Sequence, residues 1–193
     1  NDIVAADGTY LLGDEPKVPA LGCAPDPVSF PVWFSLCINR NLTIRVAAGA
    51  TVVLDGGGKK GVVLVFGGVT VYLQGLQITN GNTTERQEHA GTDLGYPGGG
   101  ILNCGTLTLT DCDVHHNNAY AGGGISNGLN AEGAWPASYK CTAHGVGPTS
   151  PWGYGTLHVA NSSVHHNSGG GILNGRDQDA GGVSTLTISN SAV

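Results

Sequence analysis

Apolar and polar side chains alternate in short runs along most of the chain. In residues 106–110, Leu107 and Leu109 alternate with three threonines, and this period of two is typical of a strand with one buried face. Further strands are predicted at 7–12, 41–46, 50–55, 62–66, 69–73 and 76–80. Glycine-rich turns separate these runs, and no segment shows the period of a helix. The pattern predicts an all-β chain of short strands.

Two linked motifs recur in the second half of the chain. Gly-Gly-Gly-Ile-x-Asn occurs three times, beginning at Gly98, Gly122 and Gly169. A second motif, which begins Gly/Ser-Thr-Leu, follows at residues 105–117, 155–167 and, in a shorter copy, 184–193. Three ordered copies of two motifs predict a solenoid, in which each coil buries its apolar edge only against neighbouring coils.

Equivalent residues of successive coils are expected to lie above one another. Strands that pair in this way are about 4.8 Å apart, which is within reach of side-chain hydrogen bonds. We therefore predict one asparagine ladder from Asn103, Asn127 and Asn174, and a second from Asn117 and Asn167. The triple glycine supplies backbone conformations that allow a sharp corner. The predicted fold is a single-stranded right-handed parallel β-helix with loop insertions.

The solenoid is predicted to form one domain over residues 1–193. Two segments are expected to leave it: a proline-rich surface excursion at 13–36 and an aromatic-rich insertion at 128–155. The chain does not begin with methionine, and its last motif copy stops in mid-coil. We therefore expect it to be a fragment of a longer protein.

The paired motifs resemble the repeat of pectin-lyase-like β-helices. Gly-Gly-Gly-Ile-x-Asn followed by Gly-Thr-Leu-Thr-Leu-Thr-Asp/Asn-x-x-Val-x-x-Asn carries this resemblance, from about residue 40 onward. It is closest to polymorphic-outer-membrane-protein type repeats, in which the best-known members have phenylalanine where Val114 and Val164 stand. The resemblance implies the fold and a surface or secreted protein, and it says much less about activity.

The charge balance argues against two classes of partner. Fourteen acidic and eight basic side chains give a formal net charge of −6, without a basic stripe for nucleic acid. No apolar run approaches the roughly 20 residues that a membrane-spanning helix needs. We therefore expect neither nucleic-acid binding nor direct insertion into a membrane.

The five cysteines lack zinc-finger spacing, which favours disulfides formed in an oxidising compartment. Cys23 and Cys37 bracket a proline-rich loop and are a predicted pair. Cys104 and Cys141 are the second predicted pair. Cys104 with Cys112 is the competing pairing, and Cys112 is otherwise expected to be a lone thiol in a column of small residues.

Three Asn-x-Ser/Thr sequons are candidate N-glycosylation sites, at Asn41, Asn82 and Asn161. Such sequons also arise by chance in a chain rich in asparagine, serine and threonine. Together with the expected disulfides, they indicate an extracellular or cell-surface location.

The 128–155 insertion carries four candidate glycan contacts: Trp135, Tyr139, Trp152 and Tyr154. Loops that leave one turn of a solenoid often form its binding face, and aromatic rings there can stack on sugars. The alternative, which we favour, is a small apolar core that anchors the loop to the solenoid.

Two His-His pairs occupy matching places in successive coils: His115 and His116, then His165 and His166. Neutral imidazoles about 5 Å apart are candidate ligands for zinc, copper or nickel. We favour solvated turn residues instead, because fewer than four rings are expected to face the same side. Asp113 is near them in sequence, but no carboxylate or thiolate ligand is clearly placed beside the four rings.

The repeat offers little for catalysis. Asp111 and Asp113 are expected to share a strand face, but Asn161 and Ser163 take their places in the next coil. No acidic column builds up, and we predict neither a catalytic residue nor a cofactor.

These patterns favour a non-catalytic extracellular structural or adhesive module. Its expected partners are extracellular glycans or further copies or segments of the same assembly. The alternative is a glycan-binding or polysaccharide-degrading β-helix domain, a lyase or hydrolase, that acts through the 128–155 insertion.

Overall fold

The computed structural model describes residues 2–12, 34–84, 97–128, 154–175 and 184–193. These ranges contain strands and turns but no helix. They therefore include no helix that is long and apolar enough to cross a membrane. The strands are β1 (Asp2–Ala5), β2 (Gly8–Leu11), β3 (Phe34–Ile38), β4 (Leu42–Val46), β5 (Val52–Asp55), β6 (Gly61–Val65), β7 (Thr70–Gln74), β8 (Leu76–Thr79), β9 (Ile101–Asn103), β10 (Thr106–Thr110), β11 (Asp113–His115), β12 (Ile125–Asn127), β13 (Thr156–Ala160), β14 (Ser163–His165), β15 (Ile172–Asn174) and β16 (Thr185–Ser189).

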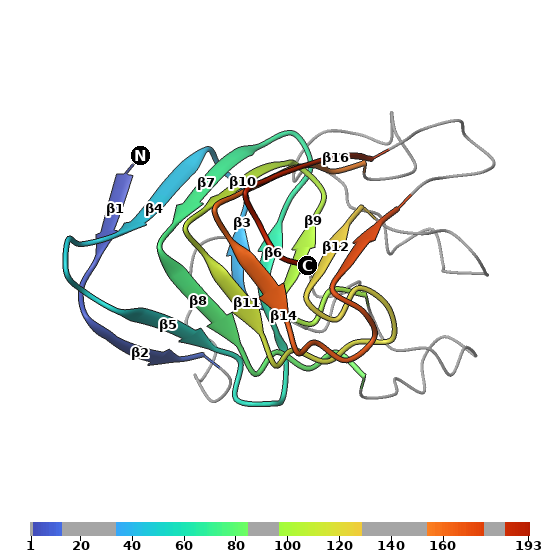
Figure 1. Ribbon diagram of the computed structural model, residues 1–193, viewed down its shortest axis with the longest axis horizontal. Helices are drawn as coiled ribbons and strands as arrows, with labels where there is room; N and C mark the ends of the chain where they lie inside the picture. The colour runs from blue at the N-terminus through green and yellow to red at the C-terminus, as the bar shows by residue number, and fades with distance from the viewer. Residues whose placement is uncertain (1, 13–33, 85–96, 129–153, 176–183) are drawn as a thin grey trace, which may run out of the picture.

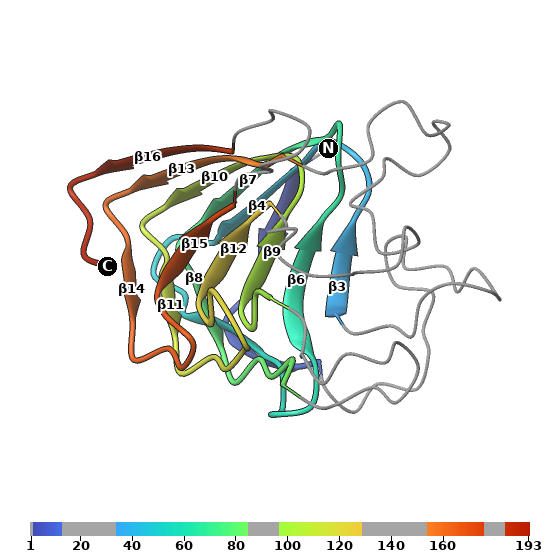
Figure 2. The ribbon, with the colours of Figure 1, turned by 90° about the vertical axis from the view of Figure 1, so that its right-hand side faces the viewer.

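The strands form three parallel sheets (Figure 1). The first sheet has the order β1-β4-β7-β10-β13-β16, the second β14-β11-β8-β5-β2, and the third β15-β12-β9-β6-β3. Every third strand along the chain therefore returns to the same sheet, next to its predecessor. Figure 2 shows these strands side by side from one coil to the next. Within the described ranges, the prediction of an all-β structure of stacked parallel repeats is confirmed.

Strands of neighbouring coils pair so that equivalent positions of the repeated motifs lie opposite each other. Leu107 of β10 lies opposite Leu157 of β13, and Val114 of β11 lies opposite Val164 of β14. A shift by one residue would turn every inward side chain outward, so the repeated apolar positions fix this alignment.

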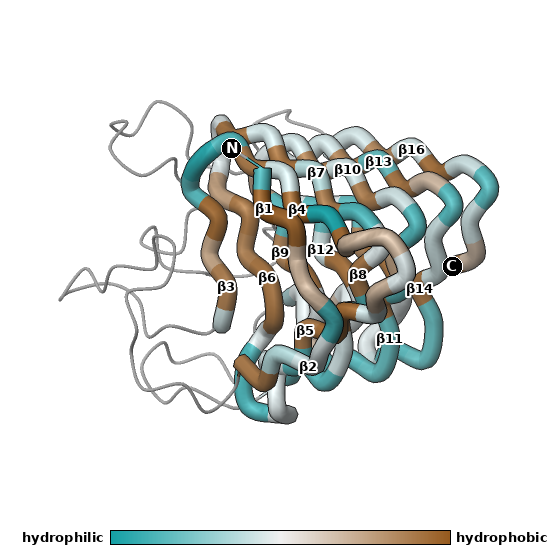
Figure 3. The backbone as a smooth tube through the Cα atoms, turned by 90° about the vertical axis from the view of Figure 1, so that its left-hand side faces the viewer, coloured by the Kyte–Doolittle hydropathy of each residue, from teal (hydrophilic) through white to brown (hydrophobic). Residues whose placement is uncertain are grey.

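The core is a continuous apolar column inside the coils. Leu107, Leu109, Val114 and Ile125 are fully buried in it. Figure 3 shows the apolar positions recurring at similar places in successive coils. Full burial of one such aliphatic side chain stabilises the fold by about 1.5–3 kcal/mol, so most of the stability comes from contacts between coils.

The triple-glycine corners require glycine for two reasons. Gly98 and Gly122 open their motifs with positive φ angles of 79° and 58°, which side-chain-bearing residues rarely adopt. At the second position, a Cβ atom on Gly123 would lie 1.9 Å from the backbone oxygen of Ser168 in the next coil. The corner therefore depends on direct backbone packing between coils.

The first asparagine ladder runs through the interior of the stack. Asn103 Nδ2 donates to Asn127 Oδ1 at 2.7 Å, and Asn127 Nδ2 donates to Asn174 Oδ1 at 2.7 Å. Asn103 and Asn127 are both completely buried. The predicted column thus satisfies buried amides at the corner after the third sheet.

The second ladder connects Asn117 and Asn167. Both the backbone N–H and the Nδ2 group of Asn117 donate to Asn167 Oδ1, at 2.9 and 3.1 Å. Asn117 Oδ1 accepts a hydrogen bond from the backbone N–H of Gly81 in the preceding coil, at 2.8 Å. This column extends the repeat into the first half of the chain.

Two features of the first part of the chain differ from the prediction by more than a residue or two at a strand end. The expected opening strand at 7–12 is β2, and β1 precedes it; a four-residue run next to a terminus carries too little pattern to predict. The excursion predicted at 13–36 extends too far, because β3 already begins at Phe34. The ring of Phe34 lies over Gly61, where a Cβ atom would be 2.3 Å from it, and this contact draws the strand into the third sheet.

Candidate functional site

The histidine pairs lie where strands of the second sheet end. His115 closes β11 and His165 closes β14, and these two residues pair in register. The residues that follow them, His116 and His166, have positive φ angles of 54° and 51°. Asn80 takes this place one coil earlier, also with a φ of 54°. Asparagine and histidine are among the residues that adopt left-handed backbone most readily, so this turn accounts for part of the pattern.

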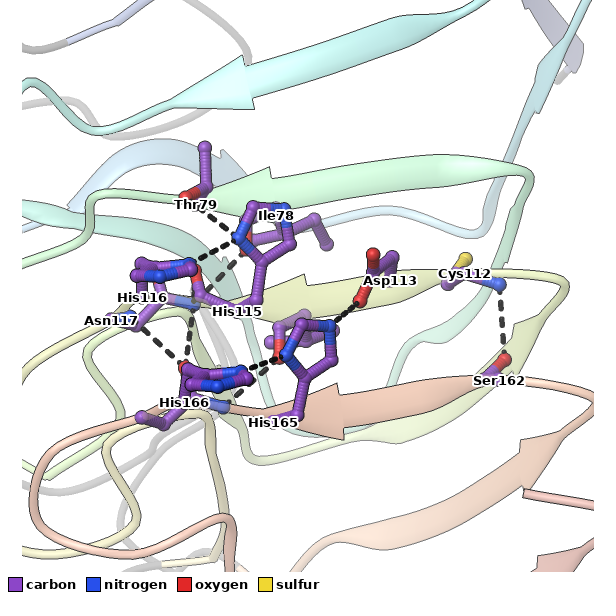
Figure 4. Close-up of polar contacts among 12 residues, drawn as sticks. Ile78, Thr79, Cys112, Asp113, His115, His116, Asn117, Ser162, His165 and His166 are labelled. Carbon is purple, nitrogen blue, oxygen red and sulfur yellow. Dashed lines mark hydrogen bonds and ion pairs between the residues drawn. The ribbon is translucent and has the colours of Figure 1, made fainter. Parts of the chain in front are cut away.

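All four imidazole rings lie together (Figure 4). The rings of His115 and His165 stack with centroids 5.4 Å apart, and those of His116 and His166 with centroids 5.3 Å apart. The expectation that fewer than four rings would face one side is therefore wrong. The left-handed residue turns the chain so that its own side chain joins that of the preceding residue.

Within each coil the two rings present Nδ1 atoms to each other. The Nδ1–Nδ1 distance is 2.8 Å between His115 and His116, and 2.5 Å between His165 and His166. The ring planes within each pair are nearly perpendicular. Each pair therefore brings two ring nitrogens into close contact.

A carboxylate and a hydroxyl adjoin the rings. Asp113 Oδ1 lies 2.9 Å from His165 Nε2. Thr79 Oγ1 lies 3.3 Å from His115 Nδ1. Thr79 was not singled out from the sequence, although the register that places Thr79 beside His115 follows from the repeat.

The two aspartates do not share a strand face as predicted. Asp113 lies in β11, whereas Asp111 lies in the turn after β10 with a φ of 54°. The turn separates the two side chains, so only Asp113 contacts the histidines.

Burial is the main cause that lowers the pKa of His115 below its usual value. The carboxylate of Asp113 opposes this effect, and the other three imidazoles add to it. Protonation of His115 would place a cation in a partly buried position beside rings that compete for the same proton. The neutral ring, which keeps a free lone pair on one nitrogen, is therefore favoured at neutral pH.

The four imidazoles do not form a ready-made multidentate site. Among the described residues, no group of three or more His, Cys, Asp or Glu side chains is arranged to hold a metal ion. Each coil instead offers one pair of nitrogens.

Three of the four aromatic candidates, Trp135, Tyr139 and Trp152, lie outside the described residues. Tyr154 is half-buried just before β13. Glycan contact through these four residues stays a prediction, as does the anchoring alternative.

A groove of about 550 Å³ runs along the corner after the first sheet. Its polar lining comprises Arg45, Gln74 and Asp111, and its apolar lining is made of valine and alanine. Gln74 Nε2 donates to Asp111 Oδ2 at 3.4 Å. No aromatic ring lines this groove, so it lacks a stacking surface for a sugar.

The structure tests the predictions for some of the cysteines and not for others. Cys37 and Cys104 are both buried and share a small apolar cluster. Their predicted partners, Cys23 and Cys141, lie outside the described residues, so both pairings stay predictions. Cys112 is a free buried thiol, which contradicts the competing Cys104–Cys112 pairing.

The backbone N–H of Cys112 donates to Ser162 Oγ, and that of Ser162 to Ser191 Oγ, both at 3.0 Å. Cys112 therefore occupies the small-residue column that the repeat predicts. Its thiol sulfur lies 3.4 Å from the backbone oxygen of Leu73.

We expect Cys112 to resist alkylation in the folded protein. Burial raises the pKa of the thiol, and the thiolate is the reactive form. Iodoacetamide at pH 8 should modify Cys112 only after unfolding in urea, as measured by mass spectrometry of its peptide. Equal labelling rates with and without urea would contradict the buried position.

The sequons have different surroundings. Asn41 and Asn161 are exposed. Asn82 is half-buried, and its Nδ2 group donates to the backbone oxygen of Gly58 at 3.0 Å. Glycosylation modifies this nitrogen, so the structure favours Asn41 and Asn161 over Asn82 as acceptors.

Comparison with known proteins adds no assignment. No protein-family model, curated protein or solved structure matches this chain. Function is therefore inferred from the residues and their geometry.

Proposed function

We propose that the chain is a right-handed parallel β-helix of the pectin-lyase-like type that serves as a non-catalytic structural or adhesive module outside the cell. The observation that carries this proposal is the stacking of the coils, in which every third strand joins the same parallel sheet. Buried asparagine ladders connect these coils from inside. A stack stabilised in this way is suited to a stiff rod that displays loops.

The repeat positions support a structural role. Asp111 and Asp113 are replaced by Asn161 and Ser163 in the next coil, and Asp113 is engaged by His165. Hydrolysis of a glycosidic bond generally uses two carboxyl groups on either side of that bond. The next coil thus carries an amide and a hydroxyl at the positions of these two carboxylates.

The cysteines and sequons support an extracellular location. The proposed disulfides join Cys23 to Cys37 and Cys104 to Cys141, and the buried positions of Cys37 and Cys104 suit this use. Asn161, at an exposed turn, is available to carry a glycan.

The proposed partners are extracellular glycans and further segments or copies of the same assembly. Ile188 of β16 supports the second kind of partner. It is 43% exposed, whereas Val159, its partner in β13, is buried. Another coil stacked on β16 would cover this apolar position.

A cleavage assay on a panel of polysaccharides, together with a glycan array, tests the proposal. We expect no new chain ends, with or without saturable binding. Turnover would contradict the structural proposal and favour the alternative, in which a lyase or hydrolase acts through the 128–155 insertion. If glycans bind, Trp135→Ala and Trp152→Ala will show whether the insertion contributes.

A further inference from the structure

We propose that the two His-His pairs form a column of two-nitrogen chelates for Cu²⁺ or Ni²⁺, with one ion held between the facing Nδ1 atoms of each pair. Water completes the coordination of each ion. The proposal concerns His115 with His116 and His165 with His166. It is independent of the proposed structural function.

The spacing of the nitrogens suits this class of metal. Imidazole nitrogens bind late transition metals at about 2.0–2.1 Å. Two nitrogens at 90° around such an ion are then about 2.9 Å apart, whereas a tetrahedral angle places them about 3.3 Å apart. The first pair has 2.8 Å between its Nδ1 atoms. Ligands at right angles are typical of square-planar or tetragonal Cu²⁺ and Ni²⁺ sites.

The second pair needs a small adjustment. Its Nδ1 atoms are 2.5 Å apart, and a rotation of the exposed His166 ring opens that distance. His165 is half-buried, and Asp113 Oδ1, 2.9 Å from its Nε2 atom, restricts the position of its ring. The inner histidine of the pair is therefore held in place, and the outer one is free to close on an ion.

The protons can be placed in this second pair. A proton on His165 Nε2, the atom 2.9 Å from Asp113 Oδ1, leaves the Nδ1 atom of the same ring with a lone pair. Without metal, His166 Nδ1–H donates to that lone pair. On binding, this proton leaves Nδ1 and solvent returns one to the exposed Nε2 of His166. The pair then offers two lone pairs while its net charge stays unchanged.

Asp113 has the role of a positioning residue. A carboxylate that accepts a hydrogen bond from the far nitrogen of a metal-binding histidine orients the ring and makes the ligating nitrogen more basic. Asp113 Oδ1 is shielded from solvent and makes no hydrogen bond with the described residues, so it is free to accept one from His165 Nε2, which lies 2.9 Å away. The His165–His166 pair is therefore expected to bind first.

The spacing between coils requires separate ions. Stacked rings of the two pairs have centroids 5.3 and 5.4 Å apart, so one ion with bonds of about 2.0 Å does not reach corresponding nitrogens in both coils. This agrees with the lack of a group of three or more ligands in the described ranges. Repulsion between two adjacent dications weakens the second binding event.

The test is a titration of the 193-residue chain with CuSO₄ and with NiCl₂ at pH 7.4. Calorimetry measures the binding of both ions, and electron paramagnetic resonance reports the ligands of copper. We expect one tight ion and a weaker second one, with the copper spectrum split by two nitrogens. The double variant His116→Asn/His166→Asn should bind at least about 10-fold more weakly. Asparagine suits these positions because Asn80 adopts the same left-handed turn.

His158→Asn is the matched control, since it removes a lone, half-buried imidazole from β13 and should leave the affinity unchanged. Asp113→Asn keeps all four histidines and should weaken the tight site by about 10-fold or more. Unchanged copper affinity in the double variant, or a spectrum with a single nitrogen, would overturn the proposal. If the double variant fails to fold, the copper affinity of Asp113→Asn and the copper spectrum of the unmodified chain test the proposal in its place.

Discussion

Replacement of Asn127 by alanine is expected to lower the free energy of unfolding by about 4 kcal/mol. The completely buried side chain makes four hydrogen bonds, and each contributes about 1 kcal/mol. Its Nδ2 group donates to Gly155, Asn174 and Thr185, and its Oδ1 atom accepts from Asn103. Alanine also leaves a space that the stacked backbone does not close.

Urea denaturation followed by circular dichroism measures this effect. Asn174→Ala is the matched control, because Asn174 stands at the same motif position but is exposed. Asn174 makes two hydrogen bonds, with Asn127 Nδ2 and with the backbone oxygen of Ser184, so we expect a loss of about 2 kcal/mol there. Similar losses in the two variants would contradict the buried ladder.

The second large effect is expected for Gly124→Ala, the third glycine of its motif. The new Cβ atom would lie 2.6 Å from the backbone oxygen of Gly171 and 2.8 Å from a methyl carbon of Val164. Backbone and core must both shift to admit it, and overpacking of this kind costs about 3 kcal/mol or more. A lower midpoint in thermal or urea unfolding measures the loss.

Gly171→Ala is the control for this substitution. Gly171 is the equivalent third glycine, and its Cβ atom would first meet a methyl carbon of Val193 at 3.1 Å. A methyl group can move aside, and alanine restricts the unfolded chain, so we expect little change or a slight gain in stability. Equal destabilisation at both positions would show that coil packing is not the reason for the glycine.

The stacking of the coils could be predicted because the residues that recur in the motifs are those that face the core. Leu107 and Leu157, or Val114 and Val164, occupy the same motif positions, and the register follows from aligning them. The asparagine columns follow from the same alignment. Cys112 was also placed correctly, because its equivalents in other coils are small residues that leave room for a thiol.

The sequence did not predict features that depend on local backbone handedness. The αL turns at His116 and His166 bring neighbouring side chains to one side, whereas the alternation of a strand would separate them. The turn at Asp111 has the opposite effect, because it separates the side chain of Asp111 from that of Asp113. The start of β3 at Phe34 was missed because its packing partner, Gly61, is distant in sequence and lacks a side chain that would indicate the contact.

The register between coils is the central claim, and methyl nuclear Overhauser effects test it most directly. In protein with labelled Leu and Val methyl groups, we expect cross-peaks between Leu107 and Leu157, Leu109 and Val159, and Val114 and Val164. Adjacent strands about 4.8 Å apart bring these methyl groups within range. Absence of all three, with cross-peaks to other partners instead, would contradict the stacked-coil fold.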